Sequence, residues 1–133
     1  MYQKLFECSD DWLKYAIGVH LLHKTDDELT QLKAAALADE RIQSFLRDVE
    51  HFHATLVSNH KNPTLPVNKL LFLLDLGFGT DIPEIRTAVD QILEHHDGNG
   101  VYQSMTNIPT HFGGTGTDVF SWCLCDAPRL LLA

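Results

Sequence analysis

Asp81-Ile-Pro83 and Asp126-Ala-Pro128 are two copies of one helix-start signal, and the chain around them decides the fold. An aspartate at an N-cap accepts a hydrogen bond from the first turn, and a proline at the start of a helix needs no N–H partner. The two aspartates are 45 residues apart, and Asp39, a third predicted N-cap, precedes Asp81 by 42 residues. Intervals of this length favour a helical-hairpin repeat.

Only residues 129–133 follow the second signal. A helix this short needs an apolar neighbour and further turns to be stable, so its side chains Leu130-Leu-Leu-Ala133 predict an incomplete helical layer. We expect residues 1–133 to form a single helical domain. Two alternatives stay open, a whole domain or an incomplete fragment of a larger array.

Amphipathic periodicity predicts helices through the first two thirds of the chain. Apolar residues recur every four positions over Asp10–His23, which predicts one helix. Thr25-Asp-Asp-Glu28 has the pattern of a capping box and predicts the start of a second helix. Asp39 is expected to cap a third, and the pattern leaves open whether the second and third helices are continuous.

The middle of the chain predicts an inner and an outer helix. Residues 58–66 are polar and Pro-rich and predict a loop, and Val67–Leu76 is apolar nearly all round, as expected of an inner helix that ends at Gly77. The helix capped by Asp81 has one polar side and so predicts an outer helix. Residues 97–122 are Gly-rich and aperiodic, which predicts a long loop, either functional or packed between helical repeats.

The turn Asp97-Gly-Asn-Gly-Val-Tyr102 and the helix start after Trp122 resemble repeats of the α/α-toroid proteins, the terpenoid cyclase and protein prenyltransferase type. In those repeats a helix ends in an Asp-Gly-rich turn that leads to an aromatic residue. The resemblance implies an all-α fold, a helical-hairpin array or partial α/α toroid with one long Gly/aromatic loop. It also implies an apolar, isoprenoid-like ligand.

The motifs that carry catalysis in that family have no counterpart in this chain. Gly100-Val101-Tyr102 stands where the cyclase repeat has Gly-X-Trp, and no Asp-X-Asp-Asp occurs. Prenyltransferases hold zinc through Asp-X-Cys and a distant His, whereas this chain has Cys123-X-Cys125-Asp126. The resemblance therefore transfers no catalytic residue, and whether the chain is an enzyme stays open.

Composition excludes some classes of partner. The formal net charge is −8, and clustered Lys and Arg, on which nucleic-acid binding depends, are absent from the sequence. The longest apolar run, Leu70–Leu76, already contains Asp75 and falls far short of the roughly 20 residues of a membrane span. The first residues lack a secretory pattern and the three cysteines are odd in number, so we expect a cytoplasmic protein with reduced thiols.

Two groups of side chains have the chemistry of zinc ligands. His111, Cys123 and Cys125 lie in or beside the long loop, with Asp126 next to them, and the alternative is that the cysteines are buried and Asp126 caps the last helix. His20 and His23 share a helix face and could bind a metal with His51 or His53, although such pairs are usually polar edge residues. His95 and His96 are expected at a helix C-terminus, where imidazolium suits the dipole.

His111 is the strongest candidate for a general acid or base, because it precedes Phe112-Gly113-Gly114 in the loop. Asp118 or Asp126 could orient it, and the alternative is a loop histidine bonded to backbone. Gly113–Gly116 lacks the Lys-Ser/Thr of a phosphate loop, so we do not expect phosphate binding there. Catalytic candidates are thus His111, Asp118 and Asp126, with no cofactor required.

Four aromatic residues of the loop could instead line a ligand pocket or pack in the core: Tyr102, Phe112, Phe120 and Trp122. The sequence predicts a domain that binds an apolar small molecule. The alternative is a noncatalytic helical scaffold for protein–protein association, in which residues 130–132 complete a partner's helix layer or a homo-oligomer.

Overall fold

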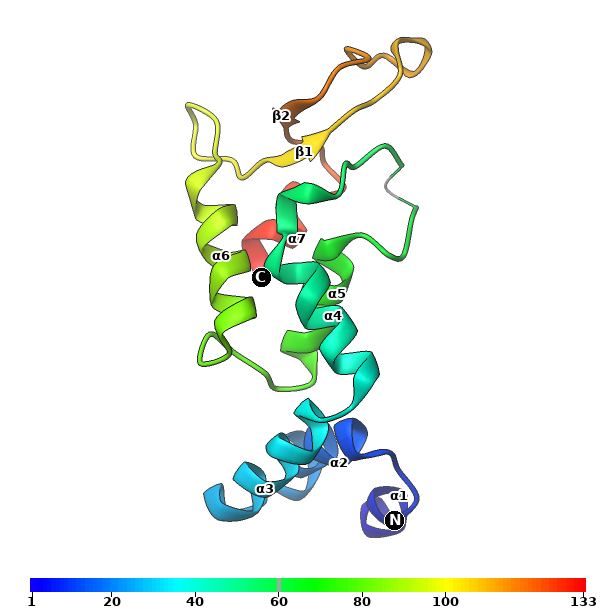
Figure 1. The fold of residues 1–133 in the computed structure, drawn as a ribbon, viewed down its shortest axis with the longest axis vertical. Helices are drawn as coiled ribbons and strands as arrows, with labels where there is room; N and C mark the ends of the chain where they lie inside the picture. The colour runs from blue at the N-terminus through cyan, green and yellow to red at the C-terminus, as the bar shows by residue number, and fades with distance from the viewer. Residues whose placement is uncertain (60) are drawn as a thin grey trace.

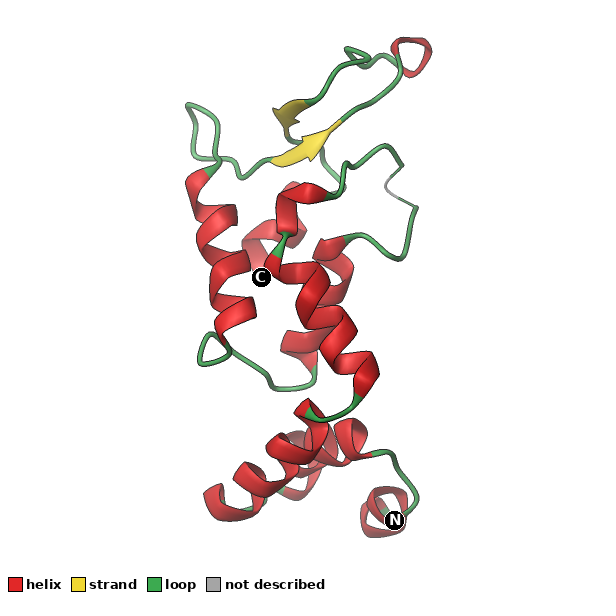
Figure 2. Cartoon of the chain, viewed as in Figure 1, coloured by secondary structure: helices red, strands yellow, loops and turns green. Residues whose placement is uncertain are grey.

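The computed structural model describes residues 1–59 and 61–133, and it is mostly helical (Figures 1 and 2). The prediction of a helical fold is therefore confirmed, but a small two-stranded sheet was not predicted. The predicted loop over residues 58–66 is non-helical up to Leu65, with His60 outside the described residues. The elements are α1 Tyr2–Glu7, α2 Asp11–Ile17, a π-helical turn Gly18–Leu22, α3 Asp26–Leu37, α4 Glu40–Glu50, a 3₁₀ turn Phe52–Ala54, α5 Pro66–Asp75, α6 Pro83–Glu94, β1 Ser104–Thr106, a 3₁₀ turn Thr110–Phe112, β2 Val119–Ser121 and α7 Ala127–Leu132.

The molecule is elongated, and its elements form three groups along the long axis (Figure 1). Helices α1–α3 form one end, the hairpin of β1 and β2 forms the other, and α4–α7 lie between them. None of the described helices is long and apolar enough to cross a membrane.

Two of the predicted helix starts are confirmed. Glu28 N–H donates to Thr25 Oγ1 and the Glu28 carboxylate accepts from Thr25 N–H, which completes the capping box of α3. The Asp39 carboxylate accepts from Arg41 N–H at 2.8 Å and begins α4. Asp39 also settles the open question of continuity, because α3 ends at Leu37 and α4 starts at Glu40.

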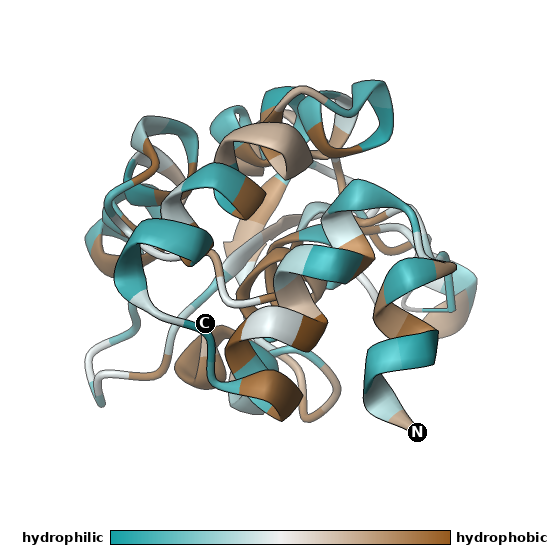
Figure 3. Ribbon diagram, turned by 90° about the horizontal axis from the view of Figure 1, so that it is seen from below, coloured by the Kyte–Doolittle hydropathy of each residue, from teal (hydrophilic) through white to brown (hydrophobic). Residues whose placement is uncertain are grey.

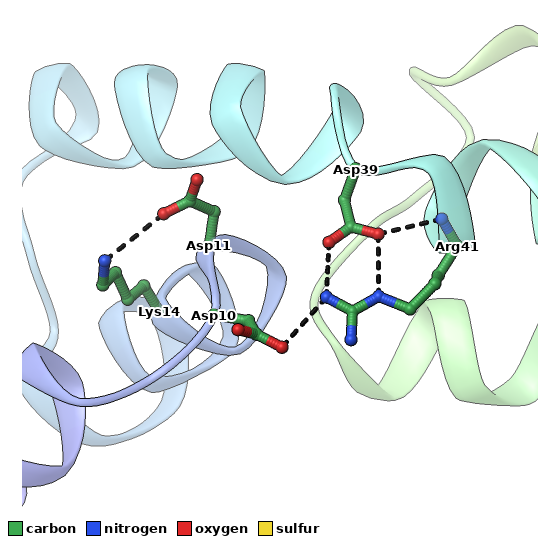
Figure 4. Close-up of polar contacts among 5 residues, drawn as sticks. All are labelled: Asp10, Asp11, Lys14, Asp39 and Arg41. Carbon is green, nitrogen blue, oxygen red and sulfur yellow. Dashed lines mark hydrogen bonds and ion pairs between the residues drawn. The ribbon is translucent and has the colours of Figure 1, made fainter.

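An ion-pair cluster joins the starts of α2 and α4 (Figure 4). Arg41 Nη2 lies 2.6 Å from Asp39 Oδ2 and 2.9 Å from Asp10 Oδ2, so one guanidinium bridges two carboxylates. The hydrogen bonds from Arg41 hold the pKa of Asp39 at about 2. The N-terminal helices are thus fastened to the central group by charge as well as by packing.

Two aspartates that were expected to cap helices do not make the cap hydrogen bond with their side chains. Helix α6 begins at Pro83 with Ile82 at the N-cap, and the Asp81 carboxylate pairs with Lys33 of α3 instead. Asp126 occupies the N-cap position of α7, but its backbone is already helical and its side chain makes no cap bond among the described residues. In both helices proline fixes the first turn, so the cap hydrogen bond is dispensable.

The core lies among the central helices. Helix α4 packs against α5 and α6, and α5 also contacts α7. Leu70 and Leu73 of α5 are fully buried, whereas Phe72 on the same helix reaches the surface, so the helix is less completely covered than its composition predicts. Hydrophobic and hydrophilic residues alternate around the helical turns (Figure 3), which is why each helix can bury one face. The other fully buried large side chains are Ile42, Leu46, Val49, Leu65 and Ile85.

Gly77 ends α5 as predicted, with φ of 99°. The Tyr15 hydroxyl donates to its carbonyl at 3.0 Å, and a Cβ at this position would lie only 3.3 Å from the side chain of Val19. The helix predicted over Asp10–His23 lies where it was expected, but only its first part is α-helical. Helix α2 ends at Ile17, and a π-helical turn follows. Gly18 lies at this change, under Leu29 and Leu32 of α3.

The predicted loop over residues 97–122 contains the hairpin. Strands β1 and β2 are antiparallel, with Met105 opposite Phe120. Val57, from the segment after α4, pairs in parallel with Thr106 on the free edge of β1, donating its N–H to Met105 O at 2.9 Å. The hairpin is therefore fixed to the helices through backbone bonds from a distant segment.

Candidate functional site

The turn after α6 is built by one aspartate. Asp97 Oδ1 accepts from Asn99 N–H at 2.8 Å and from Val101 N–H at 2.9 Å, and Gly100 takes a φ of 82°. The bond from Val101 is the main reason that the pKa of Asp97 is lowered, and the bond from Asn99 N–H contributes. Two side-chain bonds therefore hold the turn, and Tyr102, which directly follows it, lines the same hollow as Trp122.

An apolar hollow of about 370 Å³ lies between this turn and α7. The side chains that form it are almost all apolar, and its large side chains Trp122, Leu124 and Leu131 are exposed to solvent. We call it the apolar hollow, and its principal lining residues are Val101, Tyr102, Trp122, Leu124, Pro128 and Leu131.

A second hollow, of about 270 Å³, lies against one face of the hairpin. We call it the hairpin hollow, and its principal lining residues are Thr106, Ile108, Gly114, Ser121, Trp122 and Cys123. Trp122 lines both hollows, so the two lie next to each other at this residue. A third, wider hollow of about 640 Å³ shares Ile108 and Phe112 with the second and is bordered by Lys61 and Cys125.

The structure separates the four aromatic residues that the sequence grouped together. Tyr102 and Trp122 line the apolar hollow, whereas Phe112 lines the hairpin hollow, which Trp122 also lines. Phe120 lines none of the three hollows, because side chains alternate along a strand. Val119 and Ser121 face the hairpin hollow, which turns Phe120 to the opposite face, toward the helices.

On that opposite face Phe120 joins two histidines, a group that we call the histidine clasp: His53, His95 and Phe120. The His95 and Phe120 rings are stacked, with centroids 3.7 Å apart and planes at 11°. The His53 ring meets both edge to face, each at 5.0 Å. His53 Nε2 lies 3.1 Å from Gln91 O, and because a carbonyl only accepts, this nitrogen carries a proton. The clasp holds β2 against the end of α6.

Acid is expected to weaken the fold through His53. Burial lowers the pKa of His53 from its ordinary 6.5, and it outweighs the hydrogen bond to Gln91. Below that ordinary value the unfolded chain binds more protons, so the free energy of unfolding falls as the pH decreases from about 7.5 to about 5.5. Urea unfolding at both pH values measures this fall. His53→Gln keeps an N–H donor and should reduce it.

His51→Gln is the matched control, because His51 is two residues earlier and exposed. It should leave the pH dependence of the wild-type protein in place. Equal pH dependence in the wild type and in His53→Gln would show that burial of His53 does not govern acid sensitivity.

The three predicted catalytic residues have different environments. His111 is exposed and its ring tilts against Phe112, with centroids 4.2 Å apart. Asp118 Oδ1 accepts from Asn107 Nδ2 at 2.7 Å, which fixes the base of the loop. Asp126 is buried at the start of α7. Of the three, Asp118 has a structural role in its bond to Asn107.

The candidate metal ligands are likewise dispersed. No three His, Cys, Asp or Glu side chains among residues 1–59 and 61–133 are grouped as a metal site. His20 Nε2 bonds to Asp75 O at 2.9 Å, and His53 belongs to the clasp. Cys125 N–H donates to Cys123 Sγ at 3.3 Å, and burial raises the pKa of Cys123, which favours the thiol over the thiolate that metals bind.

The geometry of the two hollows must be interpreted from this chain alone. No family model matches the chain, and neither a curated protein nor a solved structure matches it. Tyr102 and Trp122 are predictable as lining residues because aromatic residues in a loop suggest a binding surface. No sequence motif marks Thr106 and Ser121 in the hairpin hollow, or the contact between the rings of His53 and His95.

Proposed function

We propose that this chain is a helical-array domain of the α/α-toroid type, and that it binds an apolar, isoprenoid-like ligand in the apolar hollow. One observation carries the proposal. The hollow of about 370 Å³ is walled by aromatic and aliphatic side chains from the turn, the segment after β2 and α7. Ligand sites are typically concave and mostly apolar, with few polar groups.

The order of helix contacts supports an array. In a two-layer hairpin array, alternate helices of the sequence become neighbours in one layer. Helices α4 and α6 pack together and α5 contacts α7, while α4 also packs on α5. This is the order expected if α5 and α7 form one layer and α4 and α6 the other.

The exposure of the hollow supports binding. Leu131 is 73% exposed and Leu124 is 85% exposed, which leaves apolar surface in contact with water. Covering such surface is favourable by about 25 cal/mol for each Å² removed from water. A long hydrocarbon chain laid along Trp122 and Leu131 would cover it.

Leu131→Asp is expected to weaken binding of radiolabelled farnesol at least about tenfold in equilibrium dialysis, because it puts a charge into the wall of the hollow. Leu132→Asp is the matched control. Leu132 lies on the same helix and is 77% exposed, but it does not line the hollow. Equal loss in both variants, or no saturable binding of farnesol to the wild type, would contradict the proposal.

A second function is favoured by the exposure of Leu132 itself. Together with Leu124 and Leu131 it extends the apolar surface beyond the hollow, as an interface for protein–protein association would. The same two variants separate the functions. Light scattering that shows concentration-dependent association, abolished by Leu132→Asp, supports the scaffold, and a monomer at all concentrations opposes self-association.

A further inference from the structure

The hydroxyl groups of the hairpin hollow form a chain with one direction. Thr106 Oγ1 lies 3.1 Å from Val119 O, and because a carbonyl only accepts, Thr106 donates its single proton there. Thr106 Oγ1 also lies 2.6 Å from Ser121 Oγ. With the proton of Thr106 already used, Ser121 is the donor of that bond. The direction therefore runs from Ser121 through Thr106 to Val119.

This direction leaves Ser121 Oγ as an acceptor toward the hollow. A hydroxyl has one proton and two lone pairs, and Ser121 uses its proton on Thr106. Both hydroxyl-bearing residues line the hairpin hollow, and Thr106 is buried. A ligand group that meets Ser121 must therefore donate a hydrogen bond.

The Gly-rich loop that also lines the hairpin hollow uses its N–H groups within the loop itself. Gly113 N–H donates to Thr110 O at 3.0 Å, and Gly114 N–H donates to Pro109 O at 3.2 Å. Gly116 N–H donates to Ile108 O at 2.9 Å. These donors close the loop on itself. A phosphate would need such N–H groups pointing outward.

Charge around the two hollows is also unfavourable to anions. Among the described residues that line the apolar and hairpin hollows there is no Lys or Arg. The turn that borders the apolar hollow carries Asp97, and the whole chain has a formal net charge of −8. A diphosphate or carboxylate would have no cation to pair with there.

We infer that the ligand is a neutral isoprenoid alcohol, whose hydrocarbon part lies in the apolar hollow and whose hydroxyl donates to Ser121 Oγ in the hairpin hollow. Trp122, which lines both hollows, lies between the two parts of the ligand. The inference rests on the proposed function, because it names the chemical class of that ligand. It assigns Ser121 the recognition of the head group.

Three probes of one chain length test the inference: farnesol, the hydrocarbon farnesene and farnesyl phosphate. Farnesol should bind the wild type at least about tenfold more tightly than farnesyl phosphate. Ser121→Ala should weaken farnesol about fivefold, which corresponds to about 1 kcal/mol for one hydrogen bond, and should leave farnesene unchanged. Unchanged farnesene binding also reports that the hollow is intact.

Ser104→Ala is the matched control, because Ser104 pairs with Ser121 across the hairpin but lines neither hollow. It should leave farnesol binding unchanged. Farnesyl phosphate bound as tightly as farnesol, or farnesol affinity unaffected by Ser121→Ala, overturns the inference and leaves the proposed function in place. Absence of binding for both farnesol and farnesene overturns the proposed function itself.

Discussion

Leu70→Ala is expected to lower the free energy of unfolding by about 2–5 kcal/mol, the range for a buried leucine whose cavity is not refilled. Leu70 is 0% exposed and lies on α5, the helix that contacts both α4 and α7. Its loss leaves a cavity where these helices meet. Urea unfolding followed by far-ultraviolet circular dichroism measures the change.

Leu93→Ala is the control for this substitution. Leu93 lies on α6 and is 52% exposed, so the same chemical change should cost less than about 0.5 kcal/mol. A loss below about 1 kcal/mol for Leu70→Ala would mean that α5 is not central to the core.

Gly114→Ala is expected to disrupt the loop of the hairpin hollow. A Cβ at this position would overlap the carbonyl oxygen and Cβ of Ile108, and the carbonyl belongs to the backbone and cannot rotate away. Ile108 O accepts from Gly116 N–H, so moving it breaks the bond that closes the loop. We expect a loss of about 1–3 kcal/mol in stability, the usual cost of overpacking, together with weaker farnesol binding.

Hydrogen exchange of the Gly116 amide measures the opening of the loop directly, and it should become faster in Gly114→Ala. Gly98→Ala provides the control, since no atom lies within 4 Å of a Cβ placed there. If Gly114→Ala kept the slow exchange of the Gly116 amide, the close approach to Ile108 would not constrain the loop.

The parts of the fold that depend on residues close together in the sequence could be predicted from it. The capping box at Thr25 and the N-cap at Asp39 involve bonds within three residues, and both are confirmed. Asp81 was predicted wrongly because Lys33, 48 residues away, binds its carboxylate. The hairpin was missed because its strands have three residues each, too few to show an alternating pattern, and because Val57 pairs with it from a distance.

Of the candidate site, only the aromatic lining residues could be predicted from the sequence. The sequence predicts that Tyr102 and Trp122 line a pocket because they are aromatic residues of the irregular loop, and they do line the apolar hollow. For His53 the sequence suggests only a metal ligand, since nothing local links it to His95, 42 residues later. The roles of Thr106 and Ser121 depend on the pairing of two strands, which the sequence does not reveal.

Phe120 and Ser121 are adjacent in the sequence, and their side chains lie on opposite faces of the hairpin. The contacts on both faces therefore favour the same register of β2 against β1. A slip of β2 by one residue would exchange the faces. Phe120 would then fill the hairpin hollow, and the Ser121 hydroxyl would lie against the ring of His95 without its bond to Thr106. A one-residue slip thus loses ring stacking and a hydroxyl bond together, so both faces of β2 favour the observed register.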